Sequence, residues 1–135
     1  MFSGDLIAFV AGLSAVKSAA ASVSWSNQPT PSDTSPSITA FEAAGQIDQT
    51  HGGANNLRTA RIQFDILAGT KDPKGVATVK TLRSAINTAL VGVAQTMGGT
   101  KVGSCIHEND LDFFDAGPLS FRGVTEMSFQ YQATS

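Results

Sequence analysis

The sequence predicts a single α+β domain over residues 1–135, in which a mixed or mainly antiparallel sheet of about four to five strands carries two main helices on one face. Its length lies in the size range of one domain built around one core. Segments with an apolar period of three to four residues are separated by segments with a period of two. Helices interspersed with non-local strands favour the α+β class.

The first periodic segment predicts a helix over residues 3–19. Its apolar positions recur at steps of three and four residues, namely Leu6, Ile7, Val10, Leu13 and Val16. Asp5 lies in the first turn, where a carboxylate complements the helix dipole. A signal peptide would instead carry Lys or Arg before the apolar run. We therefore expect an ordinary core helix, and the run is too short to span a bilayer.

Strands are expected where polar and apolar residues alternate. The clearest is Arg58–Ala68, which places Ala60, Ile62, Phe64 and Ile66 on one face. The other predicted strands cover residues 22–25, 38–43, 101–107 and 121–131. The last of them alternates Gly123, Thr125, Met127, Phe129 and Tyr131 with more polar neighbours.

A second helix is expected from Pro73 to about residue 94. Asp72 is a suitable N-cap, and proline is tolerated in a first helical turn. The apolar stripe consists of Val76, Val79, Leu82, Ile86, Ala89 and Val93. Gly98-Gly99 ends this segment. Lys80 and Arg83 lie off the stripe, so we expect both side chains to face solvent.

Three segments are expected to be exposed loops, at about 26–37, 45–57 and 108–120. The first contains three prolines, which cannot donate to a strand ladder. The second is polar with Gly52-Gly53 at its middle, as in a long hairpin connection or a flexible arm. The third is acidic and aromatic, and we expect a solvated turn held by Phe113 and Phe114.

The charge pattern excludes some partners. The formal net charge is -2, and the nine Lys and Arg residues are scattered along the chain rather than clustered. Direct nucleic-acid binding is therefore not expected. Charged residues make up only 15% of the chain, fewer than in most soluble domains. We expect protein partners to cover part of this thinly charged surface.

Two groups of residues suggest chemistry, and neither has a complete pattern. Acidic residues alternate as in a calcium loop at Glu108, Asp110, Asp112 and Asp115. A calcium loop also needs a glycine at its sixth position and a glutamate at its twelfth, which are here Phe113 and Leu119. Cys105 and His107 could form a thiol and base pair on one strand face, but no orienting group or oxyanion site follows. We expect a buried structural cysteine, no metal and no cofactor.

Several segments resemble the tail-terminator, or tail-completion, proteins of long-tailed bacteriophages. The strand Arg61–Thr70 and the helix Leu82–Leu90 resemble the family's "RIQ-D-A" strand and the helix with its "A-AL" signature. An acidic and aromatic linker and the strand Phe121–Tyr131 follow, as in the family. Pro36–Ala40 is similar to the start of an earlier strand in these proteins.

The resemblance implies a non-enzymatic virion protein at the head-proximal end of the tail, assembled in the host cytoplasm. Such proteins form a ring, typically a homo-hexamer, that caps the tail tube, ends its polymerisation and offers a docking surface to the head or neck connector. Candidate protein-contact residues lie in the expected loops, namely Gln28, Asp33, Gln49, His51, Asn55, Asn56, Asp110, Asp112 and Phe114. A head-tail connector or minor tail protein of the same virion is the alternative, and a small cysteine-dependent hydrolase is a third hypothesis.

Overall fold

The computed structural model describes residues 2–26, 35–50, 53–68, 75–115 and 120–132, with the backbone alone at 44–50, 53–57, 114–115 and 120. The elements are α1 (Phe2–Ala11), α2 (Ser14–Ser18), β1 (Ser22–Trp25), β2 (Ser37–Thr50), β3 (Gly53–Leu67), α3 (Gly75–Leu90), β4 (Gln95–Met97), β5 (Thr100–Asp115) and β6 (Ser120–Gln132). Among the described residues, helices and strands thus combine in the α+β class that the sequence predicts.

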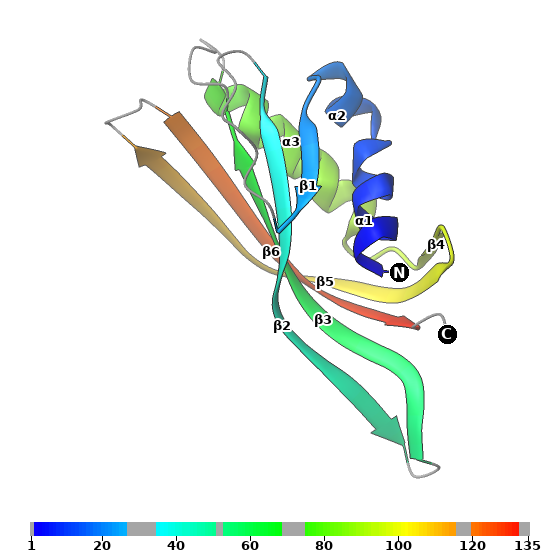
Figure 1. The fold of residues 1–135 in the computed structure, drawn as a ribbon. Coiled ribbons are helices and arrows are strands. Elements are labelled where there is room, and N and C mark those ends of the chain that lie inside the picture. Colours follow the sequence, from blue (N-terminus) through cyan, green and yellow to red (C-terminus); the bar gives the residue numbers. More distant parts are fainter. Residues whose placement is uncertain (1, 27–34, 51–52, 69–74, 116–119, 133–135) are drawn as a thin grey trace.

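The strands form one curled six-stranded sheet in the order β1-β2-β3-β6-β5-β4 (Figure 1). Only β1 and β2 pair in parallel, and the other neighbours are antiparallel. The prediction of a mixed or mainly antiparallel sheet is confirmed, but the prediction of four to five strands is wrong. The additional strand, β4, has three residues, and a turn at Gly98-Gly99 folds it onto β5. So short a strand carries no readable alternation.

The helices cover one face of the sheet, here called the helix face (Figure 1). Alternate residues of the central strands point into the core between the sheet and the helices, as the sequence predicts for β3 and β6. The largest fully buried side chains include Ile62, Phe64 and Ile66 of β3, Met127 and Phe129 of β6, and Leu6 of α1. One hydrophobic cluster contains residues from both helices and strands. The opposite side of the sheet is called the outer face.

The first predicted helix, residues 3–19, is divided in two. α1 ends at Ala11, and Leu13 before α2 has an extended backbone with φ -66° and ψ 138°. Gly12 lies at the break, where its low helix propensity favours an end. Leu6, Val10 and Val16 are buried as expected, and Phe2 joins them by stacking on Tyr131 at a centroid distance of 4.1 Å.

The predicted second helix lasts to residue 94, whereas α3 ends at Leu90. Its buried face consists of Gly75, Val79, Leu82, Ile86 and Leu90. Val76 and Val93 from the predicted stripe are 46% and 37% exposed. The middle of the predicted stripe, Val79, Leu82 and Ile86, is buried, and only its two ends differ, because α3 packs on β6 and β3 and ends before Val93. The predicted N-cap Asp72 and Pro73 lie outside the described residues.

The loop predictions at 45–57 and 108–120 are wrong for the part of each segment that is described. β2 continues to Thr50, β3 begins at Gly53, and β5 continues to Asp115. Backbone ladders hold these extensions. Residues 45–57 are mostly polar, and the irregularity between His107 and Asn109 breaks the alternation along β5, so neither segment shows the continuous apolar pattern of a half-buried strand. Of the first loop, residues 27–34 lie outside the described residues, and Ser37 is already in β2.

Candidate functional site

The acidic residues of β5 are held in side-chain contacts. Arg83 of α3 donates to Asp112 Oδ1 at 2.5 Å and to the carbonyl oxygen of Leu111 at 3.1 Å. The Arg83 side chain is only 13% exposed, so the expectation that it faces solvent is wrong. A long side chain at the rim of a helix can reach the neighbouring strand while its stem stays covered. Arg83 thereby ties α3 to β5.

Asp110 lies in a polar cluster on the helix face. Its Oδ1 is 2.8 Å from His107 Nε2, and Thr125 Oγ1 donates to Asn87 Oδ1 at 3.0 Å. Burial raises the pKa of Asp110, but the hydrogen bond from His107 and the positive charge of Arg83 act against it, and this pKa lies below its usual value. Asp110 is therefore a carboxylate at neutral pH.

The remaining predicted contact residues fall into two groups. Gln49, Asn55, Asn56 and Phe114 lie on strands rather than loops, and only their backbone is described. Gln28, Asp33 and His51 lie outside the described residues. Their role in contacts stays a prediction.

The outer face of the sheet is polar at its centre. Arg61 of β3 pairs with Glu126 of β6 at 2.8 Å, and Arg122 lies 3.8 Å from Asp65. Glu108 accepts a hydrogen bond from Ser128 at 2.9 Å. These exposed pairs fix side-chain directions and contribute little stability.

Along β5 the outer face becomes apolar. Ile106, Leu111 and Phe113 are 61%, 43% and 45% exposed, and Arg122 stacks over the Phe113 ring at 4.8 Å. A register irregularity between His107 and Asn109 inserts Glu108. This bulge brings Ile106 to the same face as Leu111 and Phe113, although simple alternation would separate even from odd positions. The patch was not predicted, because the acidic and aromatic sequence suggested a solvated turn held by Phe113 and Phe114.

Both long outer strands have open edges. β1 covers β2 only at Ser37–Ala40, and β4 covers β5 only at Thr100–Val102. Gly92 N–H further donates to the Cys105 carbonyl at 2.8 Å. Beyond these contacts, no described strand pairs with the outer side of residues 41–50, called the β2 edge, or of residues 106–115, called the β5 edge. Such edges present backbone donors and acceptors to other chains.

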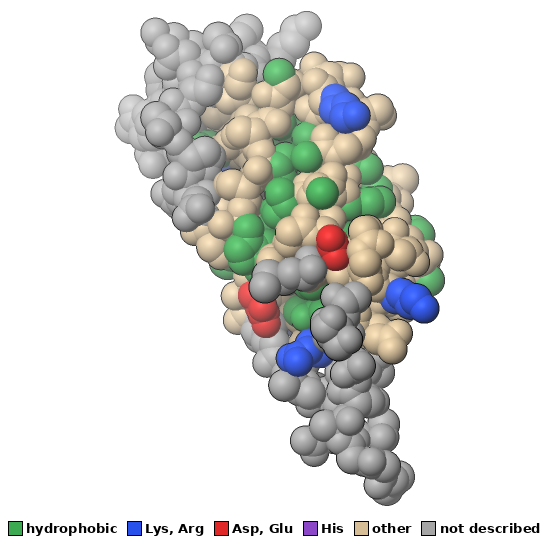
Figure 2. All heavy atoms as spheres, turned by 45° about the vertical axis from the view of Figure 1, so that its right-hand side comes forward, with side chains coloured by type: hydrophobic (Ala, Val, Ile, Leu, Met, Phe, Trp, Pro, Cys, Tyr) green, Lys and Arg blue, Asp and Glu red, His purple; other side chains and the backbone are tan. Residues whose placement is uncertain are grey.

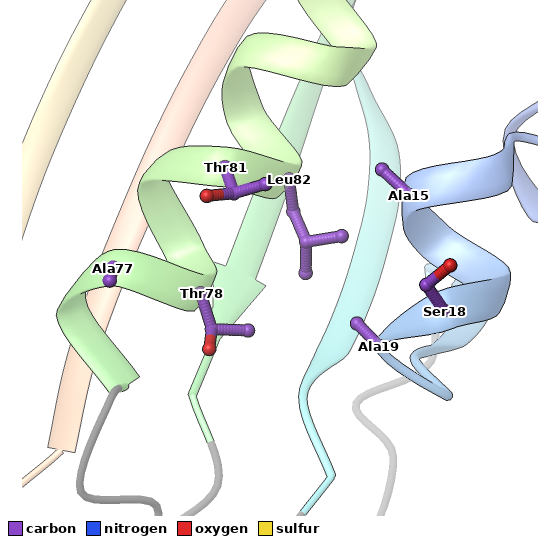
Figure 3. Close-up of a pocket in the computed structure, with 7 residues that line it drawn as sticks. All are labelled: Ala15, Ser18, Ala19, Ala77, Thr78, Thr81 and Leu82. Atoms are coloured by element: carbon purple, nitrogen blue, oxygen red, sulfur yellow. The ribbon is translucent and has the colours of Figure 1, made fainter.

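A groove of about 300 Å³ lies between α2 and α3, where small side chains face one another (Figure 3). Its lining residues are Ala15, Ser18, Ala19, Ala77, Thr78, Thr81 and Leu82. None of them is ionisable, so the groove offers no acid, base or metal ligand. Figure 2 shows the helix side of the molecule as apolar and uncharged side chains with few scattered charges.

Cys105 is buried on the helix face, and burial raises the pKa of its thiol to about 12. The thiol is therefore protonated at neutral pH, whereas a nucleophile requires the thiolate. Within the described ranges no three His, Cys, Asp or Glu side chains gather as a metal site would require. Among the same residues no helix has the length and apolar character needed to cross a membrane.

Comparison with known proteins relates the chain to virion components. Residues 4–132 match the family model of Tail completion protein gp17. A chain from the virion of a native gene transfer agent particle has a TM-score of 0.59 and 16% identity, over 93% of this chain and 86% of that one. Another solved structure has a TM-score of 0.60 and 15% identity, over 99% of this chain and 92% of that one. The two structures show a shared fold. The curated protein sequences gave no significant match.

Proposed function

The chain belongs to the Tail completion protein gp17 family, and from this membership we propose that it is a tail terminator, which forms a ring on the last ring of the tail tube. It is a structural protein of a bacteriophage tail. The proposed ring ends tube polymerisation and provides the docking surface for the head or neck connector. The family match over residues 4–132 is the observation that carries the proposal.

The surface of the molecule supports assembly through protein contacts. A cyclic ring needs two different patches on each subunit, and a rotation that closes prevents open-ended growth. A standard interface covers about 800 Å² on each partner. Two such patches, a tube-facing surface and a connector-facing surface would together explain why only 15% of the residues are charged.

We place the contacts on the surfaces that the sequence analysis selected. Those on strands are Gln49, Asn55, Asn56, Asp110, Asp112 and Phe114, and the others are Gln28, Asp33 and His51. The proposed partners are further copies of the chain, six in a ring, together with the tail tube protein and the connector. The proposed location is the head-proximal end of the tail, after assembly in the host cytoplasm.

Native mass spectrometry tests the ring directly. The chain is measured alone and with tube protein, and a closed ring of six copies is expected in at least the second sample. A strict monomer in both samples would contradict the proposal.

Electron microscopy of particles made without this gene tests the terminator role. Tails of irregular length that are not joined to heads are expected, because tube growth would have no stop and heads no docking surface. Normal tails joined to heads would contradict this role. Antibody labelling at the baseplate would instead support a minor tail protein.

We propose no enzymatic role, and thiol labelling tests this. Cys105 is buried with a pKa raised to about 12, so a disulfide reagent near pH 7 should modify the native chain slowly. A Lys101→Cys variant is the control, because Lys101 is exposed and its thiol should react quickly. Rapid, stoichiometric modification of Cys105 in the folded wild-type chain would revive the hydrolase hypothesis.

A further inference from the structure

We propose that neighbouring copies in the ring join by strand pairing, with the β5 edge of one copy against the β2 edge of the next. This inference rests on the proposed ring and adds the interface that builds it. The occupant of each edge is a second copy of the same chain. The sheets of all copies thereby become one continuous, closed sheet.

The two edges complement one another in position. The sheet order places β2 and β5 on opposite sides of the central pair β3 and β6. Each edge continues past the short strand that covers its beginning, and both reach a similar length, at residues 41–50 and 106–115. An edge at each side of one sheet gives the two different patches that a head-to-tail ring requires.

Strand direction also fits. β2 is antiparallel to β3, β3 to β6, and β6 to β5, so β5 runs opposite to β2. Rotation about an axis roughly along the strands preserves strand direction. A neighbour's β2 beside β5 is then antiparallel to it, which is the pairing used by every neighbour in the sheet except β1 and β2.

The registers determine how the copies are staggered. Ala44 is level with Ile106 through Arg61 and Ser128, and Phe41 is level with Asn109. If two neighbouring copies lay at the same height, the β5 edge of one would therefore overlap the β2 edge of the next over only about four residues. A slide of about six residues, roughly 20 Å, gives full overlap.

In a closed ring this slide requires tilted strands. Four strands, β2, β3, β6 and β5, span about 19 Å at the usual strand spacing. A 20 Å slide for each subunit then corresponds to a tilt of about 45° from the ring axis, at the upper end of the range in closed barrels. The positions of β1 and β4 at opposite corners of the sheet thus favour a tilted ring.

Exposed apolar side chains accompany the β5 edge. Ile106, Leu111 and Phe113 belong to the five large apolar residues that are exposed in the described part of the chain. A long, apolar, open edge is a template for association unless a partner covers it. A neighbouring β2 would lie against these side chains and shield them from water.

Proline would block the pairing at a residue whose N–H points outward from the edge, and two carbonyl groups show which residues these are. The Cys105 carbonyl points away from β6 because it accepts from Gly92, and the Ala40 carbonyl points toward β1 because it accepts from Ser26. Every second residue of a strand turns its N–H and C=O to the same side. Glu42 lies two residues after Ala40, and Asp112 pairs with Gly123, an even number of residues along β6 from the Phe129 partner of Cys105. The N–H groups of Asp112 and Glu42 therefore also point outward. Proline at either position removes an edge donor without removing a bond inside the sheet.

The test compares Asp112→Pro and Glu42→Pro with the matched variants Asp112→Ala and Glu42→Ala. The alanine variants lose the same carboxylates but keep the N–H groups. Native mass spectrometry with tube protein should show at least tenfold less ring for each proline variant than for its matched alanine variant. Rings at the wild-type level in folded proline variants would overturn the inference.

Mixing the two proline variants tests the head-to-tail arrangement. Asp112→Pro keeps only the β2 edge able to pair, and Glu42→Pro keeps only the β5 edge. An equimolar mixture should therefore give a heterodimer of one copy of each variant and no ring. A mixture that remains entirely monomeric, or that forms complete rings, would contradict the pairing.

Amide hydrogen exchange on the wild-type ring gives a measurement that needs no variant. Outward amides in 41–50 and 106–115 should exchange at least tenfold more slowly in the ring than in dilute monomer, while Ile62 and Phe64 are protected in both. Unchanged exchange at both edges would refute edge pairing while leaving the ring itself intact. A wild-type chain that never forms a ring would refute the proposed function as well.

Discussion

Asp5 connects the first helix to the hairpin of β4 and β5. Thr100 Oγ1 donates to Asp5 Oδ2 at 2.5 Å, and this hydrogen bond, joined by one from the Gly99 backbone, holds the pKa of Asp5 below its usual value. Gly98 between these strands has φ +55°, and a Cβ there would lie 2.5 Å from Asp5 Oδ1. The carboxylate therefore sits directly over a turn that favours glycine.

The lowered pKa predicts a pH dependence. Because the folded pKa of Asp5 is below the unfolded value of about 3.9, its stabilisation is present above that value and is lost as pH falls through the folded pKa. Asp5→Asn should lower the free energy of unfolding at pH 7 and flatten its dependence on pH below about 4. Urea unfolding at several pH values measures both. Acid limbs of equal slope in variant and wild type would contradict the prediction.

Gly123 is required by close packing between β6 and α3. A Cβ at this position would lie 2.6 Å from Val79 Cγ1 and 3.3 Å from Arg83 Nη1. Gly123→Ala should therefore destabilise the chain by about 1–3 kcal/mol, measured by urea unfolding. Gly4→Ala is the control, because no heavy atom lies within 4 Å and alanine favours helix, so this variant should be neutral or stabilised by up to about 1 kcal/mol. A neutral Gly123→Ala would show that α3 can move away from β6.

At the scale of elements, α3 shows what packing adds to a helical pattern. Leu90 is fully buried, although the predicted stripe omitted it, whereas Val76 of that stripe is 46% exposed. Leu90→Ala should cost about 2–5 kcal/mol in the free energy of unfolding, and Val76→Ala less than about 0.5 kcal/mol. Denaturant unfolding of both variants checks this. Equal losses would mean that the predicted stripe describes the core better than the structure does.

Strands buried on one face were predictable from sequence. β1 and β6 lie within a residue of their predicted limits, and the buried face of β3 is the predicted one. Alternating apolar residues identify such strands because burial on one face requires them. The ends of β2 and β5 were not predicted, since backbone pairing with a neighbour holds the polar end of β2, and a bulge interrupts the alternation along β5.

The candidate site was predictable only in part. Asp110 and Asp112 were selected for their polarity in an expected loop, yet they lie on a strand and contact His107 and Arg83. Both contacts join residues whose approach depends on the bulge and on the packing of α3. Ile106 was missed because the bulge shifts the alternation by one residue. Open strand edges follow from sheet order, which local patterns do not contain.

For the whole molecule, the position of β6 predicts how the chain tolerates being cut. β6 is last in sequence but central in the sheet, between β3 and β5. Phe2 stacks on Tyr131, so the first and last elements are adjacent (Figure 1). A circular permutant that joins residues 135 and 1 by a short linker and begins at Ser120 should keep the wild-type free energy of unfolding within about 1 kcal/mol.

The matched control for the permutant is a truncated chain of residues 1–119, which lacks β6 altogether. It should show no cooperative unfolding, because β3 and β5 have no common partner. Circular dichroism with thermal unfolding distinguishes the two chains. A truncated chain that unfolds cooperatively would contradict the central role of β6.

This order of strands also bears on synthesis by the ribosome. While β6 is still inside the exit tunnel, β5 and the hairpin of β2 and β3 cannot join into one sheet. The two open edges thus reach their relative positions only after β6 has left the tunnel. A chain that stops before β6 would lack the geometry that the proposed ring needs, so only chains that contain β6 could join such a ring.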